Sequence, residues 1–200
     1  AQLLALHTLM SPGDNIVAAR QLYGGSINQF SQGFAKFDWH VNWADTRKPE
    51  TFKAAINDRT RAVFVESIAN PGGIITDIEA VAKNGHAPGV PLIVDNTVAT
   101  PYLVRPLEWG ADIVVHSTTK YLGGHGTSIG GVIVDGGTFD YATSPDKYPG
   151  FKEPDPSYHG LVYARDPGGG IRPTPASAPH AAEPNAVDSA VVGRPSRAIG

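Results

Sequence analysis

Six short apolar runs, separated from one another by helical or turn-rich segments, constrain this fold more than any other feature of the sequence. They are built mainly from Val, Ile, Ala and Phe with few polar interruptions, as in PLIVD and GVIVD. Strands that are apolar on both faces belong in a parallel sheet that helices cover on each side. The predicted strands occupy residues 15–19, 39–44, 61–66, 91–95, 111–116 and 131–135, of which 39–44 differs from the others because its apolar and polar residues alternate.

The segments between these runs carry the periodicity of amphipathic helices. Ile27, Phe30, Phe34 and Phe37 follow helical spacing, and a Thr at position 76 is a possible N-cap for the segment that it begins. Helices are predicted over residues 1–10, 24–37, 49–57 and 76–84. This alternation predicts a doubly wound α/β fold, in which ligands bind beyond the carboxyl ends of the strands.

Composition excludes several classes of function. The 200 residues carry a net charge of −3, which gives no electrostatic footprint for nucleic acid or an anionic membrane. The chain has no Cys, so disulfides, thiol catalysis and Cys-based zinc sites are absent, as suits a cytoplasmic protein. The seven His residues are scattered without H-E-x-x-H spacing, so no metal site is expected.

Two parts of the chain differ in composition. Residues 1–166 carry the α/β pattern, whereas residues 167–200 lack aromatic residues, Leu and Lys and are rich in Pro, Ala and Gly. We expect the second part to be a disordered tail unrelated to the first. Because the chain starts at Ala1, within a predicted helix, we also expect the first part to be truncated.

Polar residues after the predicted strands suggest a cofactor site. Asp95 closes one strand, and Lys120 follows another within the run HSTTKYLGGHG. Hydroxyls and glycine N–H groups suit a phosphate, and a nearby Lys can act as an amine nucleophile. An amine, a phosphate cradle and a buried carboxylate together describe a pyridoxal phosphate (PLP) site, for which Tyr23 would supply an aromatic face.

Residues 95–125, DNTVATPYLVRPLEWGADIVVHSTTKYLGGH, closely resemble the signature of the PLP-dependent Cys/Met metabolism (transsulfuration) family. YGG at 23–25 and VESIANP at 65–71 resemble the family as well. The resemblance implies the large PLP-binding domain of the aspartate-aminotransferase-like (fold type I) superfamily. It implies catalytic roles for Lys120, as the Schiff-base lysine, and Tyr23, which also stacks on the cofactor ring. It further implies that Asp95 binds the pyridine nitrogen, Ser117 and Thr119 the phosphate, and Asn70 the region of the phenolic oxygen.

Residues 151–160, FKEPDPSYHG, are most similar to the O-acetylhomoserine sulfhydrylases of this family. The implied activity is γ-replacement on O-acetyl-L-homoserine by sulfide or a small thiol, in a homodimer or homotetramer. Cystathionine γ-synthase or γ-lyase activity is an alternative, because those relatives share nearly all of these residues. An inactive fragment is another, because the family's N-terminal arm, phosphate loop and C-terminal domain are missing.

A serine hydrolase is a distant alternative from another class. Residues 126–130, GTSIG, match the G-x-S-x-G pattern of a nucleophile elbow, with Ser128 as the nucleophile. Such an elbow needs a strand before the Ser and a helix after it. Here a glycine-rich loop precedes Ser128 and a predicted strand follows it.

Overall fold

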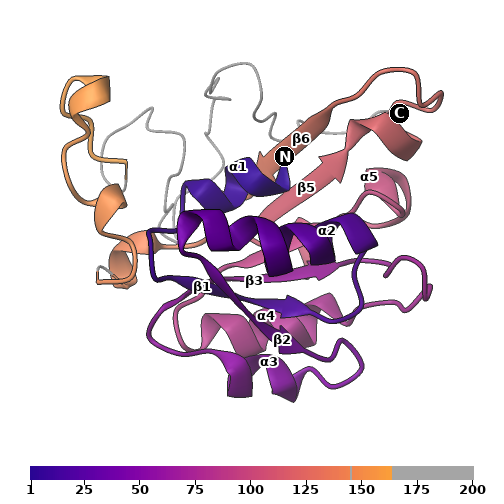
Figure 1. Ribbon diagram of the computed structural model, residues 1–200, viewed down its shortest axis with the longest axis horizontal. Coiled ribbons are helices and arrows are strands. Elements are labelled where there is room, and N and C mark those ends of the chain that lie inside the picture. The colour runs from indigo at the N-terminus through magenta and orange to yellow at the C-terminus, as the bar shows by residue number, and fades with distance from the viewer. Residues whose placement is uncertain (145, 164–200) are drawn as a thin grey trace.

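A six-stranded sheet forms the centre of the protein, for which the computed structural model describes residues 1–144 and 146–163 (Figure 1). The strand order is β2-β1-β3-β4-β5-β6, and all neighbours are parallel except β5 and β6. The strands are β1 (Asn15–Ala19), β2 (His40–Ala44), β3 (Thr60–Glu66), β4 (Leu92–Asp95), β5 (Ile113–Ser117) and β6 (Gly131–Asp135). The mostly parallel α/β sheet and all six predicted strands are therefore confirmed.

Burial explains why the apolar runs became central strands. Every residue of β1 and β3 is buried, so both faces of these strands must be covered. The chain winds from β1 to β2 in one direction and from there to β3 on the other side of β1. This reversal opens a crevice between β1 and β3 at their carboxyl ends, which is where ligands bind in open α/β sheets.

Helices cover both faces of the sheet (Figure 1). One side carries α1 (Gln2–His7), α2 (Gly24–Asn28), the π-helical turn η1 (Gln29–Gly33) and the 3-10 turn η2 (Phe34–Phe37). The opposite side carries α3 (Glu50–Ala55) and α4 (Ile78–His86). The later part of the chain adds α5 (Thr100–Leu103), η3 (Pro106–Trp109), η4 (Thr118–Leu122), η5 (Tyr141–Thr143), η6 (Pro149–Phe151) and η7 (Pro156–Tyr158).

The predicted helices are present, but the structure corrects their detail. The segment 24–37 is helical throughout, yet it is divided into α, π and 3-10 parts. The prediction of Thr76 as an N-cap was wrong, because Asp77 caps α4 by accepting a hydrogen bond from the N–H of Ala80 (3.0 Å). The Thr76 hydroxyl instead donates to the carbonyl oxygen of Glu66, so it fastens the loop after β3.

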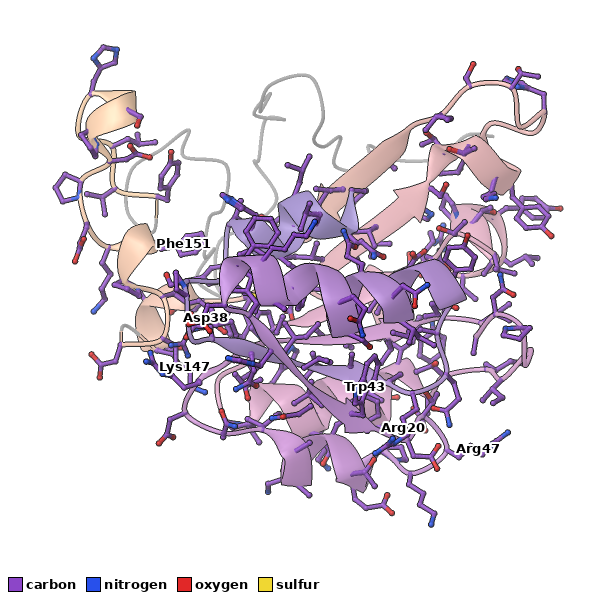
Figure 2. The ribbon with its side chains drawn as sticks, in the orientation of Figure 1. Arg20, Asp38, Trp43, Arg47, Lys147 and Phe151 are labelled. Carbon is purple, nitrogen blue, oxygen red and sulfur yellow. The ribbon has the colours of Figure 1, made fainter. Side chains whose placement is uncertain are left out.

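The two edges of the sheet can be told apart in Figure 2. Arg20 and Arg47 lie in the loops that follow β1 and β2, at the carboxyl edge. Asp38, Lys147 and Phe151 lie at the amino edge. There Phe151 stacks on Tyr141, with ring centroids 4.4 Å apart, in an aromatic cluster that packs the end of the described chain against the sheet.

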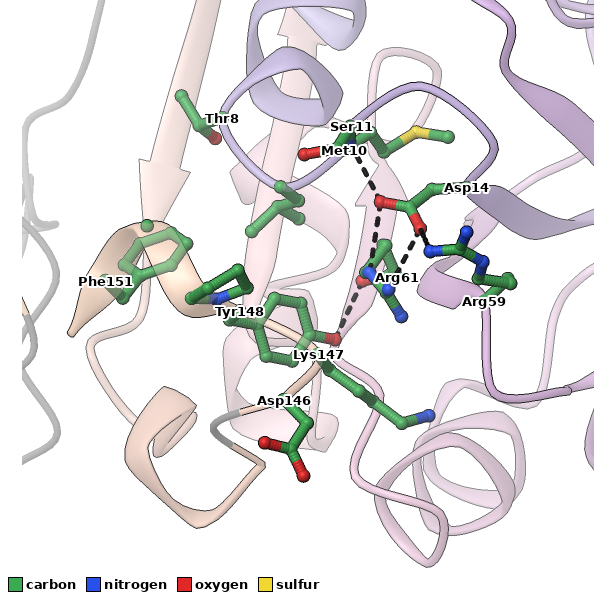
Figure 3. A pocket seen from close by; sticks show the side chains of 13 residues that line it. Thr8, Met10, Ser11, Asp14, Arg59, Arg61, Asp146, Lys147, Tyr148 and Phe151 are labelled. Carbon is green, nitrogen blue, oxygen red and sulfur yellow. Dashed lines mark hydrogen bonds and ion pairs between the residues drawn. The ribbon is translucent and has the colours of Figure 1, made fainter. Parts of the chain in front are cut away.

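A cavity of about 210 Å³ at this amino edge is built around a buried ion pair (Figure 3). Nε and Nη2 of Arg61 approach the two carboxylate oxygens of Asp14 at 3.1 and 2.9 Å. The Tyr148 hydroxyl donates to the carbonyl oxygen of Arg61 (2.9 Å). These contacts link the segment before β1 to β3 and to the segment after β6.

No helix within the described ranges, 1–144 and 146–163, has the length and apolar character needed to cross a bilayer. The predicted disordered tail, 167–200, lies outside the described residues, as does the end of the predicted domain at 164–166.

Candidate functional site

A cavity of about 440 Å³ lies at the carboxyl edge of β4 and β5, within the size range of small-molecule sites. Residues at the start of α1 and in α2 line one side of the cavity, and residues at the ends of β4 and β5 line the other. Four of the predicted site residues line it, namely Tyr23, Asp95, Ser117 and Thr119. The structure therefore brings together residues that are up to 96 positions apart, Tyr23 and Thr119, around one hollow (119 − 23 = 96).

Asp95, the last residue of β4, places a carboxyl group at the cavity. Its Oδ1 accepts hydrogen bonds from the N–H (2.9 Å) and the hydroxyl of Thr97. Burial raises the pKa of Asp95, against the opposing effects of the Thr97 hydrogen bonds, His116 and the N-terminal amino group. Within the described chain no Lys or Arg forms an ion pair with Asp95. A cationic ligand group would stabilise this carboxylate.

The turn after β5 supplies hydroxyls and backbone groups. Ser117 donates its N–H to the Thr97 hydroxyl (2.8 Å), which ties the end of β5 to the loop after β4. The Thr119 hydroxyl accepts from the N–H of Gly130 (3.1 Å), which also lines the cavity. A Cβ at position 130 would lie only 2.5 Å from Oγ1 of Thr118, so Gly is required for this close approach. Such a cradle suits the phosphate of the cofactor.

Lys120 follows Thr119 in the sequence, but it does not line the cavity. It lies in η4, where the chain kinks at Lys120 itself, and its side chain is exposed. Its backbone carbonyl accepts from the N–H of Gly124 (3.0 Å), so the residue holds the glycine-rich loop in place.

Tyr23 and Asn70 are joined by a residue that the sequence analysis did not single out. Glu66, the last residue of β3, accepts the N–H of Tyr23 at Oε1 (2.7 Å) and the N–H of Asn70 at Oε2 (2.9 Å). The side chain of Asn70 is exposed and does not line the cavity, whereas Glu66 is 5% exposed. The available signal was an acidic residue at the end of an apolar strand, the same signal that identified Asp95.

The electrostatics of Glu66 reflect its surroundings. Burial raises the pKa of Glu66 to about 7, the two backbone hydrogen bonds oppose that rise, and the charge of Asp95 adds to it. Glu66 and Asp95 are direct partners in the parallel register of β3 and β4. Two carboxyl groups thus lie on neighbouring strands at the carboxyl ends of β3 and β4.

His116 is a second residue at the cavity without a predicted role. It is 5% exposed and lines the cavity, and its Nδ1 has no hydrogen-bond partner among the described residues. Burial lowers the pKa of His116, although the charge of Asp95 and a hydrogen bond with the Asn96 backbone oppose this. A neutral ring is therefore favoured beside Asp95.

The structure does not support the serine hydrolase alternative. Ser128 is exposed in the loop before β6, so a strand follows it and a loop precedes it. A nucleophile elbow requires a strand before the Ser and a helix after it. The described residues also contain no group of three or more His, Cys, Asp or Glu side chains that could hold a metal ion.

Comparisons with known proteins place this geometry in context. A sequence profile of the family described as "Cys/Met metabolism PLP-dependent enzyme" matches residues 1–168. The chain is 52% identical over 164 residues to a sulfhydrylase of Gibberella moniliformis, covering 82% of this chain and 38% of the relative. It is 51% identical over 163 residues to the O-acetyl-L-homoserine sulfhydrylase of Leptospira meyeri, covering 82% of this chain and 36% of that protein.

Solved structures agree with the sequence matches. A Campylobacter jejuni protein that carries an N'-pyridoxyl-lysine-5'-monophosphate superposes with a TM-score of 0.73 at 37% identity, over 80% of this chain and 40% of that one. The O-acetylhomoserine sulfhydrylase of Wolinella succinogenes superposes with a TM-score of 0.67 at 35% identity, over 76% of this chain and 43% of that one. The chain thus spans well under half the length of the proteins it matches.

Proposed function

This chain belongs to the family of Cys/Met metabolism PLP-dependent enzymes, and from that membership we propose that the full-length protein is an O-acetylhomoserine sulfhydrylase. The proposed reaction is γ-replacement, in which sulfide or a small thiol displaces acetate from O-acetyl-L-homoserine to give homocysteine or methionine. The observation that carries the proposal is the partly buried Asp95 carboxyl group, which has no cationic partner among the described residues and lines a cavity that Ser117 and Thr119 also line.

The residues of the cavity fit PLP. Asp95 would hold the proton on the pyridine nitrogen, because the positive charge would offset the burial of its carboxylate. Ser117 and Thr119 would bind the phosphate, because both line the cavity beside the backbone of Gly130. Tyr23 would stack on the ring. Asn70 would lie near the phenolic oxygen, because Glu66 accepts hydrogen bonds from the N–H groups of both Asn70 and Tyr23 and so links their loops.

The chemistry follows from the position of the leaving group. Acetate cannot leave directly from Cγ, and bound PLP supplies the electron sink that makes the neighbouring C–H bonds acidic. Lys120 would hold the cofactor and, once substrate binds, its amine would remove the proton from Cα and then assist removal of one from Cβ. Asp95 would keep the pyridine nitrogen protonated during both steps. We also propose that the full-length enzyme is cytoplasmic and a homo-oligomer.

Borohydride trapping tests the proposal. Reduction of the protein with added PLP, followed by peptide mapping, should place a pyridoxyl adduct on Lys120. Lys120→Ala should lose this adduct and the visible absorption band, whereas Lys83→Ala, a matched change of an exposed Lys on α4, should keep both. An adduct on a different lysine would contradict the assignment of Lys120 and with it the proposed site.

A further inference from the structure

Glu66 occupies the point in the sheet where the loop that carries Tyr23 and the loop that carries Asn70 diverge. It ends β3, and the loop after β1 and the loop after β3 leave the sheet on either side of the crevice there. The first loop leads to Tyr23, which lines the cavity, and the second leads to Asn70. Neither loop belongs to a strand or a long helix at these positions, so something other than regular structure must fix their spacing.

The Glu66 side chain supplies that connection with one oxygen for each loop. Oε1 accepts the N–H of Tyr23 at 2.7 Å, across 43 positions of sequence, and Oε2 accepts the N–H of Asn70 at 2.9 Å. Hydrogen bonds from N–H groups to a carboxylate are shorter and stronger than those between neutral groups. The two loops are therefore held at the separation that one carboxyl group spans.

Burial makes a carboxylate a costly choice for this purpose. The residue is 5% exposed, its pKa is raised by burial and by the charge of Asp95, and no Lys or Arg forms an ion pair with it in the described part of the chain. A feature that destabilises the fold locally is expected where it serves a site. Glu66 is the residue here that contacts both loops with one rigid, planar group.

We propose that Glu66 is a positioning residue for the cofactor site, whose carboxylate sets the separation of the loops that carry Tyr23 and Asn70. It touches neither cofactor nor substrate in this proposal. The inference rests on the proposed function, because the value of a fixed spacing between these loops is that a planar ring binds between their residues. Loss of a hydrogen bond between Glu66 and either loop should therefore weaken PLP binding and change the contacts made to the bound ring.

The test compares Glu66→Gln with the unaltered protein and with Glu79→Gln, a matched change of an exposed residue on α4. The amide of Gln has one acceptor oxygen, so it can serve only one of the two N–H groups. We expect the dissociation constant of PLP, titrated by visible absorbance above pH 7 where Glu66 is ionised, to rise roughly 10- to 100-fold, which corresponds to the loss of one charge-assisted hydrogen bond. Glu79→Gln should leave it unchanged.

Two further readouts separate positioning from a general loss of stability. The pH midpoint of the visible band should shift in Glu66→Gln, because the contact proposed for Asn70 at the phenolic oxygen moves. Hydrogen exchange at the amides of Tyr23 and Asn70 should accelerate without PLP present, whereas amides in the middle of β3 should stay protected.

The outcomes distinguish this inference from the function on which it rests. If the unaltered protein forms no PLP complex, the proposed function fails. If it binds PLP, and Glu66→Gln binds equally well with an unshifted pH midpoint, the positioning role is overturned. Should Glu66→Gln fail to fold, Glu66→Asp keeps the charge on a shorter side chain that cannot reach both loops. Its PLP dissociation constant should rise roughly 3- to 10-fold, and an unchanged constant overturns the proposal.

Discussion

Asp95 shows at the scale of one residue how a binding site opposes stability. Its carboxyl group is partly buried, accepts hydrogen bonds from Thr97 on one oxygen, and forms no ion pair with any Lys or Arg in the described ranges. Burial raises the pKa of Asp95, so the folded state disfavours the charged form that the proposed cofactor contact needs. The same side chain that would bind the ligand therefore weakens the protein without it.

Asp95→Asn should separate these two effects. Asn keeps an oxygen for the Thr97 donors but removes the buried charge. We expect PLP affinity to fall at least about tenfold, because the ion pair with the pyridine nitrogen is lost. The free energy of unfolding of the cofactor-free protein at neutral pH should stay level or rise, as measured by urea unfolding.

Asp77→Asn is the matched control for this change. Asp77 is exposed, and Asn serves equally well as an N-cap, so both quantities should remain as they are in the unaltered protein. If Asp95→Asn bound PLP with the affinity of the unaltered protein, that result would contradict the role proposed for Asp95.

The sequence predicted single site residues better than it predicted their contacts. Asp95, Ser117, Thr119 and Tyr23 were identified from motif and strand position, and they share one cavity. Glu66 was overlooked although it too ends an apolar strand. Its role depends on an N–H group 43 positions away, and no local pattern encodes that distance in space.

At the scale of elements, β1 and β3 were predictable because both of their faces are buried, and uninterrupted apolar runs are typical of such strands. The edge strand β2 is only partly buried, and the alternation of apolar and polar residues predicted it instead. The ends of helices were less predictable, because Thr76 and Asp77 are both good capping residues. The tertiary contact between Thr76 and the Glu66 carbonyl decided between them.

The ion pair at the amino edge should be a strong stabilising link between elements. Asp14→Ala would leave Arg61 charged and buried without its partner, so we expect the free energy of unfolding to fall by about 3 kcal/mol or more. Arg59→Ala removes a partner that is 3.7 Å away with a side chain that is 64% exposed, so it should cost less than about 1 kcal/mol. If urea unfolding gave the same loss of stability for Asp14→Ala and Arg59→Ala, the buried pair of Asp14 and Arg61 would not be a strong stabilising contact.

At the scale of the whole molecule, Glu66 should make stability depend on pH. The folded protein retains a proton on Glu66 up to about pH 7, whereas in the unfolded chain the group titrates at its ordinary value of 4.5. Between these values the folded state binds more protons, so stability is fully present below pH 4.5 and falls as the pH rises to about 7. The loss is about 3.5 kcal/mol at most, since each pKa unit is worth about 1.4 kcal/mol.

Urea unfolding of the cofactor-free protein at about pH 5 and about pH 7.5 measures this dependence. The unaltered protein should lose more stability between the two conditions than Glu66→Gln does, because Gln does not titrate. Glu79→Gln should follow the unaltered protein. A Glu66→Gln protein with the same loss would show that Glu66 keeps an ordinary pKa in the folded state.

The pairing of Glu66 with Asp95 across β3 and β4 has a thermodynamic consequence for ligand binding. Two interacting carboxyl groups behave as one diprotic acid, whose protons are released in steps that belong to the pair. Burial is the main cause of the raised pKa of Glu66, and the charge of Asp95 adds to it, so a cation bound at Asp95 removes that added part and the pair releases part of a proton to the solvent. The heat of cofactor binding near pH 7 should then vary with the ionisation enthalpy of the buffer more in the unaltered protein than in Glu66→Gln, and the difference counts the protons that Glu66 exchanges.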